Sequence, residues 1–199
     1  MKIGLLGGTF DPVHNGHLHL AQEALAQEDL DQVIFIPAGN PWMKSDSEIS
    51  DSEIRKHMID ISIIDNPKFF SNDIELTRSG PTFTSDTLEE LVKRHRKNDH
   101  FFLILGSDAI KTFHLWNNPE RILELTKIIL AERKYDVTPT LLKELSRISD
   151  ISGKIILLKS KMLDISSSEI KRKISAGESI QGQVPNQLEE FISRLKIYR

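Results

Sequence analysis

Short apolar runs alternate with longer amphipathic segments along this chain of 199 residues, and the alternation constrains its fold more than any other feature. The runs are rich in Ile, Leu, Val and Phe, as strands are. They predict strands at residues 2–6, 32–37, 73–76, 101–105, 127–131 and 154–158. Helical spacing predicts helices at residues 16–27, 52–65, 85–96, 119–125, 140–149, 167–176 and 187–195. Strands separated by helices indicate an α/β fold built on a parallel sheet.

The composition excludes several classes of protein. Cysteine is absent, which excludes disulfides, thiolate zinc sites and cysteine nucleophiles, so any catalysis must use oxygen or nitrogen groups. The longest apolar run, residues 101–105, is far shorter than the ~20 residues of a membrane span. The first residues lack the apolar core of a signal peptide. We therefore expect one domain over residues 1–199, in the cytoplasm and without a membrane partner.

The charge is distributed unevenly. Residues 1–153 carry 17 basic and 24 acidic side chains, whereas residues 154–199 carry 9 and 5. The basic part lacks the dense Lys/Arg clusters and interleaved aromatic residues of nucleic-acid surfaces. This pattern favours a local anion site and no nucleic-acid partner.

The junction after the first predicted strand carries the clearest chemical signal. Gly7 and Gly8 allow the backbone to approach a ligand, and the helix that follows presents unpaired amides to an anion. His14 and His17 are three residues apart, so they can share one side of the first helical turn, while Gly16 keeps that side open. Two imidazoles at such a helix start suit a phosphate whose negative charge grows during a reaction.

Each of these features alone is more typical of a plain strand-to-helix connection. The glycines match neither the GxxxxGK[ST] loop nor the GxGxxG fingerprint, so those two phosphate sites are excluded. A zinc site at the two histidines lacks a nearby third ligand. The combination favours a third type of phosphate site.

Two further segments bear on the site. Ser50 with Glu53, and Ser166 with Glu169, have capping-box spacing and predict two helix starts. Residues 40–50 follow a glycine, contain a proline and several polar residues, and form a candidate substrate loop.

Two ordered motifs resemble those of the nucleotidyltransferase superfamily. Residues 8–17, GTFDPVHNGH, match its GxFDPxHxGH signature, and residues 165–171, ISSSEIK, resemble ISSTxIR. Within the superfamily the chain is most similar to the bacterial nicotinate-nucleotide adenylyltransferases. Residues 36–44 (IPAGNPWMK), 80–88 (GPTFTSDTL) and 106–108 (GSD), followed by Trp116, support this, as do Arg55 and Met58. The resemblance implies a Rossmann-like, doubly wound parallel sheet with helices on both faces.

The resemblance also implies a reaction, in which the adenylyl group of ATP is joined to nicotinate mononucleotide to give nicotinate adenine dinucleotide and pyrophosphate. His14 and His17 would be catalytic, with His17 stabilising charge at the α-phosphorus. The ATP site would comprise Gly7, Gly8, Thr9, Phe10, His14, His17, Gly106, Asp108, Ile165, Ser166, Ser167, Ser168 and Lys171. We expect the part from about residue 160 to 199 to be helical and to complete this site.

Similarly, the nicotinate nucleotide would be bound by Asn40, Lys44, Phe83, Thr84, Trp116 and Arg133. Trp116 would stack on the nicotinate ring, and the backbone amides of Phe83 and Thr84 would bind its carboxylate. Asp108 would bind a ribose hydroxyl, although its position alone also fits a helix N-cap. Mg²⁺ would be held mainly by ATP phosphates and water, so we name no protein ligand for it.

Several positions depart from the family pattern. Lys171 stands where arginine is usual; it keeps the positive charge but loses the bidentate fork of arginine. Phe83 replaces tyrosine, Ser168 replaces threonine, and Arg133 is followed by lysine where proline is common. None of these changes removes a group that the mechanism needs.

Two alternative functions remain open from the sequence. The acceptor could be nicotinamide mononucleotide or phosphopantetheine, although the chain length, His14 and Trp116 argue against a pantetheine-phosphate adenylyltransferase. A class I aminoacyl-tRNA synthetase shares the HxGH motif but needs a tRNA-binding domain. The protein could also be a nucleotide-binding sensor without turnover. One sequence leaves the oligomeric state open, with a homo-oligomer as one possibility.

Overall fold

The computed structural model describes residues 1–40, 49–131, 145–146 and 151–199, with Ser107 and Asp108 described by their backbone alone. The strands in this part of the chain form one parallel sheet in the order β3-β2-β1-β4-β5-β6. Their bounds are β1 (Lys2–Gly8), β2 (Gln32–Pro37), β3 (Phe69–Ser71), β4 (His100–Gly106), β5 (Thr126–Ala131) and β6 (Ile155–Leu158). This order confirms the expected doubly wound α/β sheet.

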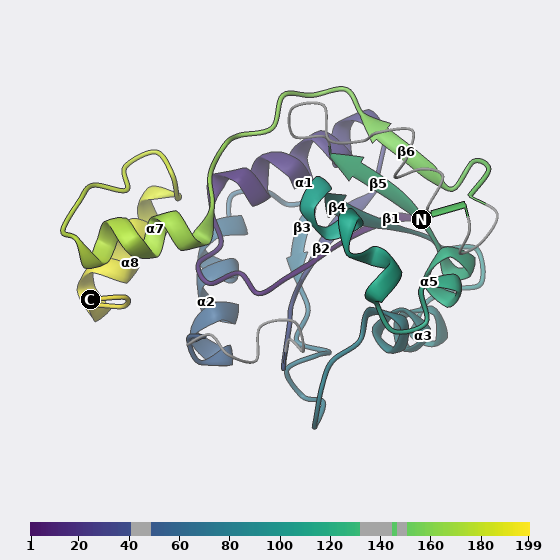
Figure 1. The fold of residues 1–199 in the computed structure, drawn as a ribbon, viewed down its shortest axis with the longest axis horizontal. Coiled ribbons are helices and arrows are strands. Elements are labelled where there is room, and N and C mark those ends of the chain that lie inside the picture. The colour runs from purple at the N-terminus through teal and green to yellow at the C-terminus, as the bar shows by residue number, and fades with distance from the viewer. Residues whose placement is uncertain (41–48, 132–144, 147–150) are drawn as a thin grey trace.

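Helices connect the strands and cover both faces of the sheet (Figure 1). They are α1 (Asn15–Gln27), α2 (Ser52–Ile63), α3 (Thr84–Arg94), α4 (Ser107–Lys111), the 3₁₀ turn η2 (Phe113–Leu115), α5 (Pro119–Leu125), α7 (Ser167–Ser175) and α8 (Asn186–Leu195). Side chains of β1 alternate between two cores because successive residues of a strand point to opposite faces. Leu6 packs with α1, α2 and α8, whereas Ile3 and Leu5 pack with α3 and α5.

One predicted strand is wrong. Residues 73–76 form a turn, and the edge strand β3 is formed earlier, by Phe69–Ser71. Ile74 is buried, as a strand residue would be, but its amide donates to Oδ1 of Asn72 at 2.9 Å. The side chain of Asn72 therefore stabilises a turn where the apolar pattern suggested a strand.

The helix predictions have similar exceptions. The segment 140–149 falls mostly outside the described residues, where only Leu145 and Ser146 are seen, both helical. The capping box expected at Ser50 is wrong, because the α2 N-cap is Asp51, whose carboxylate accepts the Glu53 amide at 2.8 Å. The short elements α4 and η2 were not predicted, since neither is long enough to show helical spacing.

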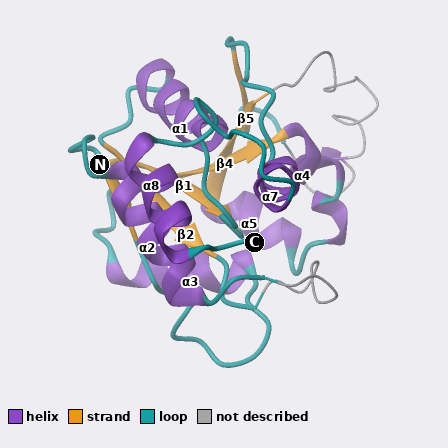
Figure 2. Cartoon of the chain, turned by 90° about the vertical axis from the view of Figure 1, so that its left-hand side faces the viewer, coloured by secondary structure: helices purple, strands orange, loops and turns teal. Residues whose placement is uncertain are grey.

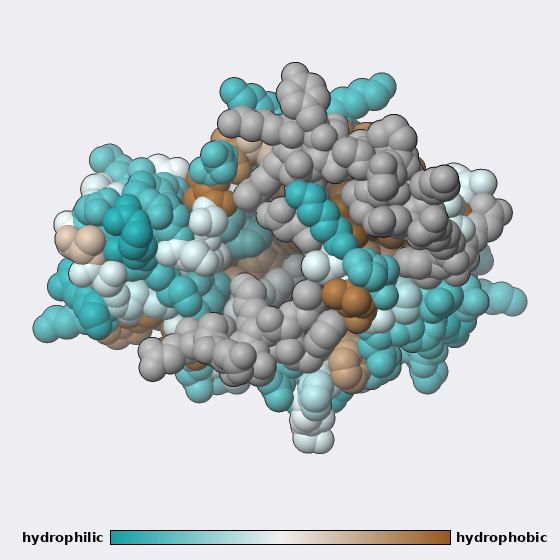
Figure 3. Space-filling model, in the orientation of Figure 1, coloured by the Kyte–Doolittle hydropathy of each residue, from teal (hydrophilic) through white to brown (hydrophobic). Residues whose placement is uncertain are grey.

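The two last helices, α7 and α8, lie beyond one end of the sheet, beside α2 (Figures 1 and 2). Their outer surface is mostly hydrophilic (Figure 3). Across the described ranges, no helix has the length and apolar character needed to cross a bilayer.

Candidate active site

A cavity of about 560 Å³ lies at the carboxyl ends of β1 and β4. These neighbouring strands flank the point where the strand order reverses, because the chain runs from β1 outward to β3 and returns to β4. Open α/β sheets bind ligands at this position. Thirteen of the predicted site residues line the cavity: Gly7, Gly8, Thr9, His14, His17, Phe83, Thr84, Gly106, Trp116, Ile165, Ser166, Ser167 and Ser168.

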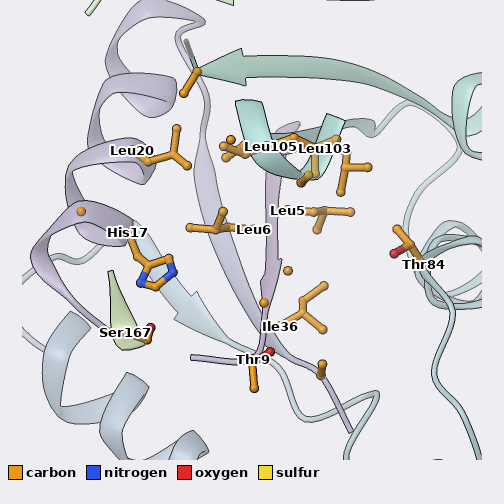
Figure 4. Close-up of a pocket in the computed structure, with 18 of the residues that line it drawn as sticks. Leu5, Leu6, Thr9, His17, Leu20, Ile36, Thr84, Leu103, Leu105 and Ser167 are labelled. Carbon is orange, nitrogen blue, oxygen red and sulfur yellow. The ribbon is translucent and has the colours of Figure 1, made fainter. Parts of the chain in front are cut away.

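Two predicted contact groups occupy different sides of this cavity. Figure 4 shows His17 and Ser167 on one side, next to the end of β1, and Thr84 on the other. Apolar side chains of the strands, including Leu5 and Leu103, lie between them (Figure 4). The cavity can therefore accept an elongated ligand with polar groups at both ends.

His14 and His17 lie together at the start of α1. Their rings stack with centroids 3.7 Å apart, and the backbone amide of His14 donates to Nδ1 of His17 at 3.2 Å. Neutral His17 must then carry its proton on Nε2. Gly16 makes the arrangement possible, because a Cβ atom there would lie 2.9 Å from Nδ1 of His14.

Phe10 supports this pair from the core and does not line the cavity. Its ring meets the His17 ring edge-on, with the centroids 5.0 Å apart. Phe10 has a φ of 51°, a left-handed conformation that turns its buried side chain beneath Gly8. The structure thus places the Phe10 side chain in the core, against the His17 ring, and its predicted contact with ATP remains a prediction.

The start of α7 forms the wall beside the histidines. The Ser166 hydroxyl accepts the Glu169 amide at 3.2 Å, which confirms the cap, although the Glu169 carboxylate pairs with Arg172 and does not return to Ser166. The Ser167 hydroxyl donates to the Pro12 carbonyl at 2.9 Å. Two of the three serine hydroxyls therefore hold the helix in place, and the first amides of α7 are the donors best suited to an anion.

Lys171 does not line the cavity. Its ammonium group pairs with Oδ2 of Asp11 at 2.9 Å, and its Nζ lies 5.7 Å from the centre of the Tyr198 ring. In the structure the Lys171 side chain pairs with Asp11. Its predicted contact with phosphate remains a prediction.

Asp11 is 4% exposed and is surrounded by donors. The Tyr198 hydroxyl donates to its Oδ1 at 2.5 Å, and the Ser50 amide donates to Oδ2 at 3.3 Å. Burial alone would raise the pKa of the Asp11 carboxyl, but these hydrogen bonds and Lys171 hold the pKa below its usual value. Burial and the Asp11 carboxylate raise the pKa of Tyr198.

Arg55 and Tyr198 extend this network, although no sequence motif includes Tyr198. The Arg55 guanidinium is buried and donates to the Thr9 carbonyl at 2.9 Å and to the Ser50 carbonyl at 3.0 Å. Thr9 is thus tied to the start of α2. Tyr198 is 187 residues from Asp11, and no local pattern could have linked them.

Glu75 is a second residue that the sequence did not single out. It lines the cavity, is 9% exposed, and accepts from the Thr87 hydroxyl at 2.8 Å. Burial raises the pKa of the Glu75 carboxyl despite hydrogen bonds from Thr87 and Thr82. A Cβ on Gly39 would lie 2.1 Å from the Glu75 carbonyl oxygen, so the chain after β2 packs directly on this segment.

The far side of the cavity is built on the start of α3. Phe83 is the N-cap and Thr84 the first helical residue, so their amides lie at the start of this helix, the end that suits an anion. Trp116 follows η2 and packs against Phe113 with the ring centroids 5.4 Å apart. Its buried indole nitrogen meets no hydrogen-bond acceptor among the described residues.

The remaining predicted residues lie at the edge or outside the description. Asn40 does not line the cavity, but its carbonyl accepts the amide of Thr82, which does. Lys44 and Arg133 lie outside the described residues. Asp108 is the second residue of α4, whose N-cap is Gly106, so the N-cap interpretation of Asp108 is wrong.

Comparisons with known proteins agree with this arrangement. The sequence model of the Cytidylyltransferase-like family matches residues 5–173. Two proteins, each named as a probable nicotinate-nucleotide adenylyltransferase, cover the whole chain. The one from Dehalococcoides mccartyi is 36% identical over 97% of its length, and the one from Clostridium tetani is 37% identical over 99%.

A solved structure shares the fold. It is the nicotinic acid mononucleotide adenylyltransferase of Plasmodium falciparum complexed with NaAD, with a TM-score of 0.80 and 22% identity. The match covers 99% of this chain and 97% of the other. With full-length relatives above one-third identity, a matching family model and both motifs in one cavity, the chain belongs to the nicotinate-nucleotide adenylyltransferase family.

Proposed function

We propose that this protein transfers the adenylyl group of ATP to nicotinate mononucleotide, giving nicotinate adenine dinucleotide and pyrophosphate for NAD synthesis. One observation carries the proposal. A single cavity has His17 and the start of α7 on one side and the start of α3 on the other (Figure 4). His14 also lines it, as does Trp116, whose neighbour Asn117 accepts from Ser85 of α3. The two sides of the cavity suit the phosphates of one nucleotide and the acidic ring of another. The names of the full-length relatives support the same activity.

The reaction needs positioning more than a side-chain nucleophile. An oxygen of the acceptor phosphate, already ionised near neutral pH, attacks the α-phosphorus of ATP. A bond forms between this oxygen and the α-phosphorus, the bond to the bridging oxygen of the β-phosphate breaks, and pyrophosphate leaves with the electron pair. Holding the two phosphates in line and neutralising their charge is sufficient for catalysis.

His17 is the residue best placed to stabilise the charge. Because its Nδ1 accepts the His14 amide, Nε2 carries a proton that can be donated to a phosphate oxygen. His14 lines the same wall and adds a second imidazole. Phe10 and Gly16 hold both rings in place, so little reorganisation is needed when charge develops on the α-phosphate.

The β- and γ-phosphates would meet the start of α7. The Ser167 and Ser168 amides are the first of the helix, and the Glu169 amide is already satisfied by Ser166. Mg²⁺ bound between the phosphates would neutralise further negative charge. Among the residues that the structure describes, no group of three or more His, Asp or Glu side chains could hold a metal ion, so phosphates and water are the ligands we propose.

The acceptor would occupy the side formed by α3. The Phe83 and Thr84 amides would bind the carboxylate of nicotinate, and Trp116 would stack on the ring. Backbone amides donate hydrogen bonds, so they can bind both oxygens of a carboxylate but cannot accept from the NH₂ group of an amide. This explains a preference for the acid.

Pyrophosphate release tests the proposal. The protein is given ATP and Mg²⁺ with nicotinate mononucleotide, nicotinamide mononucleotide or phosphopantetheine in separate reactions. We expect release to be much faster with nicotinate mononucleotide than with either of the other acceptors. A preference for either of the others would overturn the assignment of Phe83, Thr84 and Trp116, and the absence of release with every acceptor would indicate a nucleotide-binding sensor.

A further inference from the structure

Tyr198, which follows α8, connects the last part of the chain to the first motif. Its hydroxyl donates to Oδ1 of Asp11 at 2.5 Å and also lies 3.8 Å from Sδ of Met58. Asp11 stands between the glycines that end β1 and the histidines that begin α1. A residue at the far end of the sequence therefore holds the loop that shapes the phosphate side of the cavity.

The bond between Tyr198 and Asp11 is of the strong type. An O–H···O⁻ distance near 2.5–2.7 Å is typical of hydrogen bonds to an ionised carboxylate. Asp11 is almost fully buried, so its charge depends on protein donors in place of water. Lys171 and the Ser50 amide donate to Oδ2, and the Tyr198 hydroxyl donates to Oδ1.

The backbone bends unusually to bring Tyr198 to this position. Lys196 and Tyr198 have φ values of 53° and 70°, in the left-handed region that non-glycine residues rarely adopt. The Ile197 amide donates back to the Ile192 carbonyl at 3.1 Å and closes the end of α8. Such a disfavoured conformation persists only where surrounding contacts enforce it, and the contact with Asp11 is the one that reaches the site.

Asp11 also links this residue to α7. The ammonium group of Lys171, on α7, bonds Asp11 and lies over the Tyr198 ring. The Ser167 hydroxyl joins the start of the same helix to the Pro12 carbonyl, one residue after Asp11. The network therefore sets how the first amides of α7 lie relative to the His14–His17 turn.

We propose that Tyr198 is a positioning residue for the triphosphate of ATP, acting through Asp11 and Lys171. The inference rests on the proposed function in taking ATP as the nucleotide at this side of the cavity. It goes further by assigning a role to a residue outside both motifs and outside the cavity lining. The nicotinate side is built on a different element, α3, and should be independent of this network.

The test is Tyr198→Phe, which keeps the ring beside Lys171 and removes the hydroxyl that contacts Asp11 and Met58. We expect the KM for ATP and the inhibition constant of pyrophosphate to rise by the same factor, about five- to tenfold, because both ligands use the start of α7. The KM for nicotinate mononucleotide should stay within about twofold. If Tyr198 served only the stability of the fold, Tyr198→Phe would change the KM values for ATP and nicotinate mononucleotide to a similar extent.

Arg172→Gln is the matched control. Arg172 is on the same helix, but it faces solvent and pairs with Glu169 and Glu178, away from Asp11. This variant should leave both KM values within about twofold, since exposed ion pairs contribute little. If it reproduces the Tyr198→Phe result, general loosening of α7 is the cause and the proposal is overturned.

A double-mutant cycle tests the route through Asp11. In an Asp11→Asn background, Tyr198→Phe should have less than half of its effect on the KM for ATP, because the two residues act as a pair. Full additivity would overturn the proposal. If Tyr198→Phe does not fold, as judged by circular dichroism, Asp11→Asn alone must raise the KM for ATP selectively, and equal changes in both KM values would contradict the inference.

Calorimetry of ATP binding without an acceptor separates this inference from the proposed function. If the wild-type protein transfers adenylyl groups to no acceptor, the proposed function fails, yet the dissociation constants for ATP can still be compared. A five- to tenfold weaker binding by Tyr198→Phe supports the positioning role. An unchanged dissociation constant overturns it.

Discussion

The backbone amide of His14 donates a hydrogen bond to Nδ1 of His17 at 3.2 Å, and the two imidazole rings stack with their centroids 3.7 Å apart. This contact fixes the tautomer of His17, because a nitrogen that accepts a hydrogen bond cannot carry the ring proton of neutral histidine. Nε2 then carries the proton. The same contact satisfies one of the amides at the start of α1, so local helix capping and the chemistry of the site use one side chain.

Replacing His17 with alanine tests the catalytic part of the account. We expect the turnover number to fall by roughly 10² or more, equivalent to about 3 kcal/mol of lost transition-state stabilisation, with the fold intact. Steady-state kinetics and circular dichroism provide the two measurements. His19→Ala, on the same helix, serves as the control, since His19 contacts the Lys161 carbonyl away from the cavity lining. Unchanged turnover in His17→Ala would remove His17 from the mechanism.

Trp116 should contribute to the binding of nicotinate mononucleotide and much less to the binding of ATP. In Trp116→Ala, the KM for nicotinate mononucleotide should rise about fivefold, because an aromatic stacking contact contributes about 1 kcal/mol. The KM for ATP should change much less. Leu115→Ala is the control, since its neighbouring side chain is 58% exposed and lies outside the cavity lining. Equal effects on both substrates would contradict the stacking role.

Lys171→Arg should be tolerated. Arginine keeps the positive charge that bonds Asp11 and restores the side chain usual in the family, so we expect kcat/KM for ATP to stay within about threefold of wild type. The comparison is made in parallel with Lys171→Gln, which lacks the charge and should lose activity. Strong inactivation by arginine would mean that the site has been rebuilt around lysine.

The raised pKa of the Glu75 carboxyl predicts that the stability of the protein depends on pH. Burial raises the pKa of its carboxyl in the folded protein, so the folded state holds this proton at pH values where the unfolded chain has lost it. The contribution of Glu75 to stability is therefore present below the ordinary carboxyl pKa and is lost as pH rises through the folded value. Glu75→Gln cannot titrate, so its free energy of unfolding relative to wild type should increase from pH 4 to pH 7.

Chemical denaturation at several pH values provides the measurement for Glu75→Gln. Asp60→Asn is a suitable control, because Asp60 is an exposed partner of Lys56 and lies outside the cavity. A difference in unfolding free energy that does not change with pH, or that decreases toward pH 7, would contradict the raised pKa.

Most of the fold follows from the sequence because the strands and long helices carry strong periodic signals. Every strand of the sheet was predicted within two residues at either end, except β3, where Phe69–Ser71 is too short to show alternation and one of its phenylalanines is exposed at the sheet edge. The turn at residues 73–76 imitates a strand by burying Ile74. Side-chain hydrogen bonding by Asn72 decides between the two, and apolar periodicity does not report it.

The residues of the site also fall into those that the sequence predicts and those that it does not. The glycines, histidines and serines were predictable because contiguous motifs place them at strand ends and helix starts, and the parallel sheet brings those ends together. Phe10 belongs to the same motif, yet it turns into the core through a positive φ that no spacing rule predicts. Glu75 and Tyr198 were not predictable, since their roles depend on contacts between distant segments.

Transfer of labelled adenylyl groups in a competition tests the central claim most directly. ATP labelled at the α-phosphate is supplied with Mg²⁺ and equal concentrations of nicotinate mononucleotide and nicotinamide mononucleotide, and the dinucleotides are separated by chromatography. The account predicts that the label enters nicotinate adenine dinucleotide at least about tenfold more than NAD, with pyrophosphate released unlabelled. Equal labelling of the two dinucleotides, a preference for NAD, or no labelled dinucleotide would contradict it.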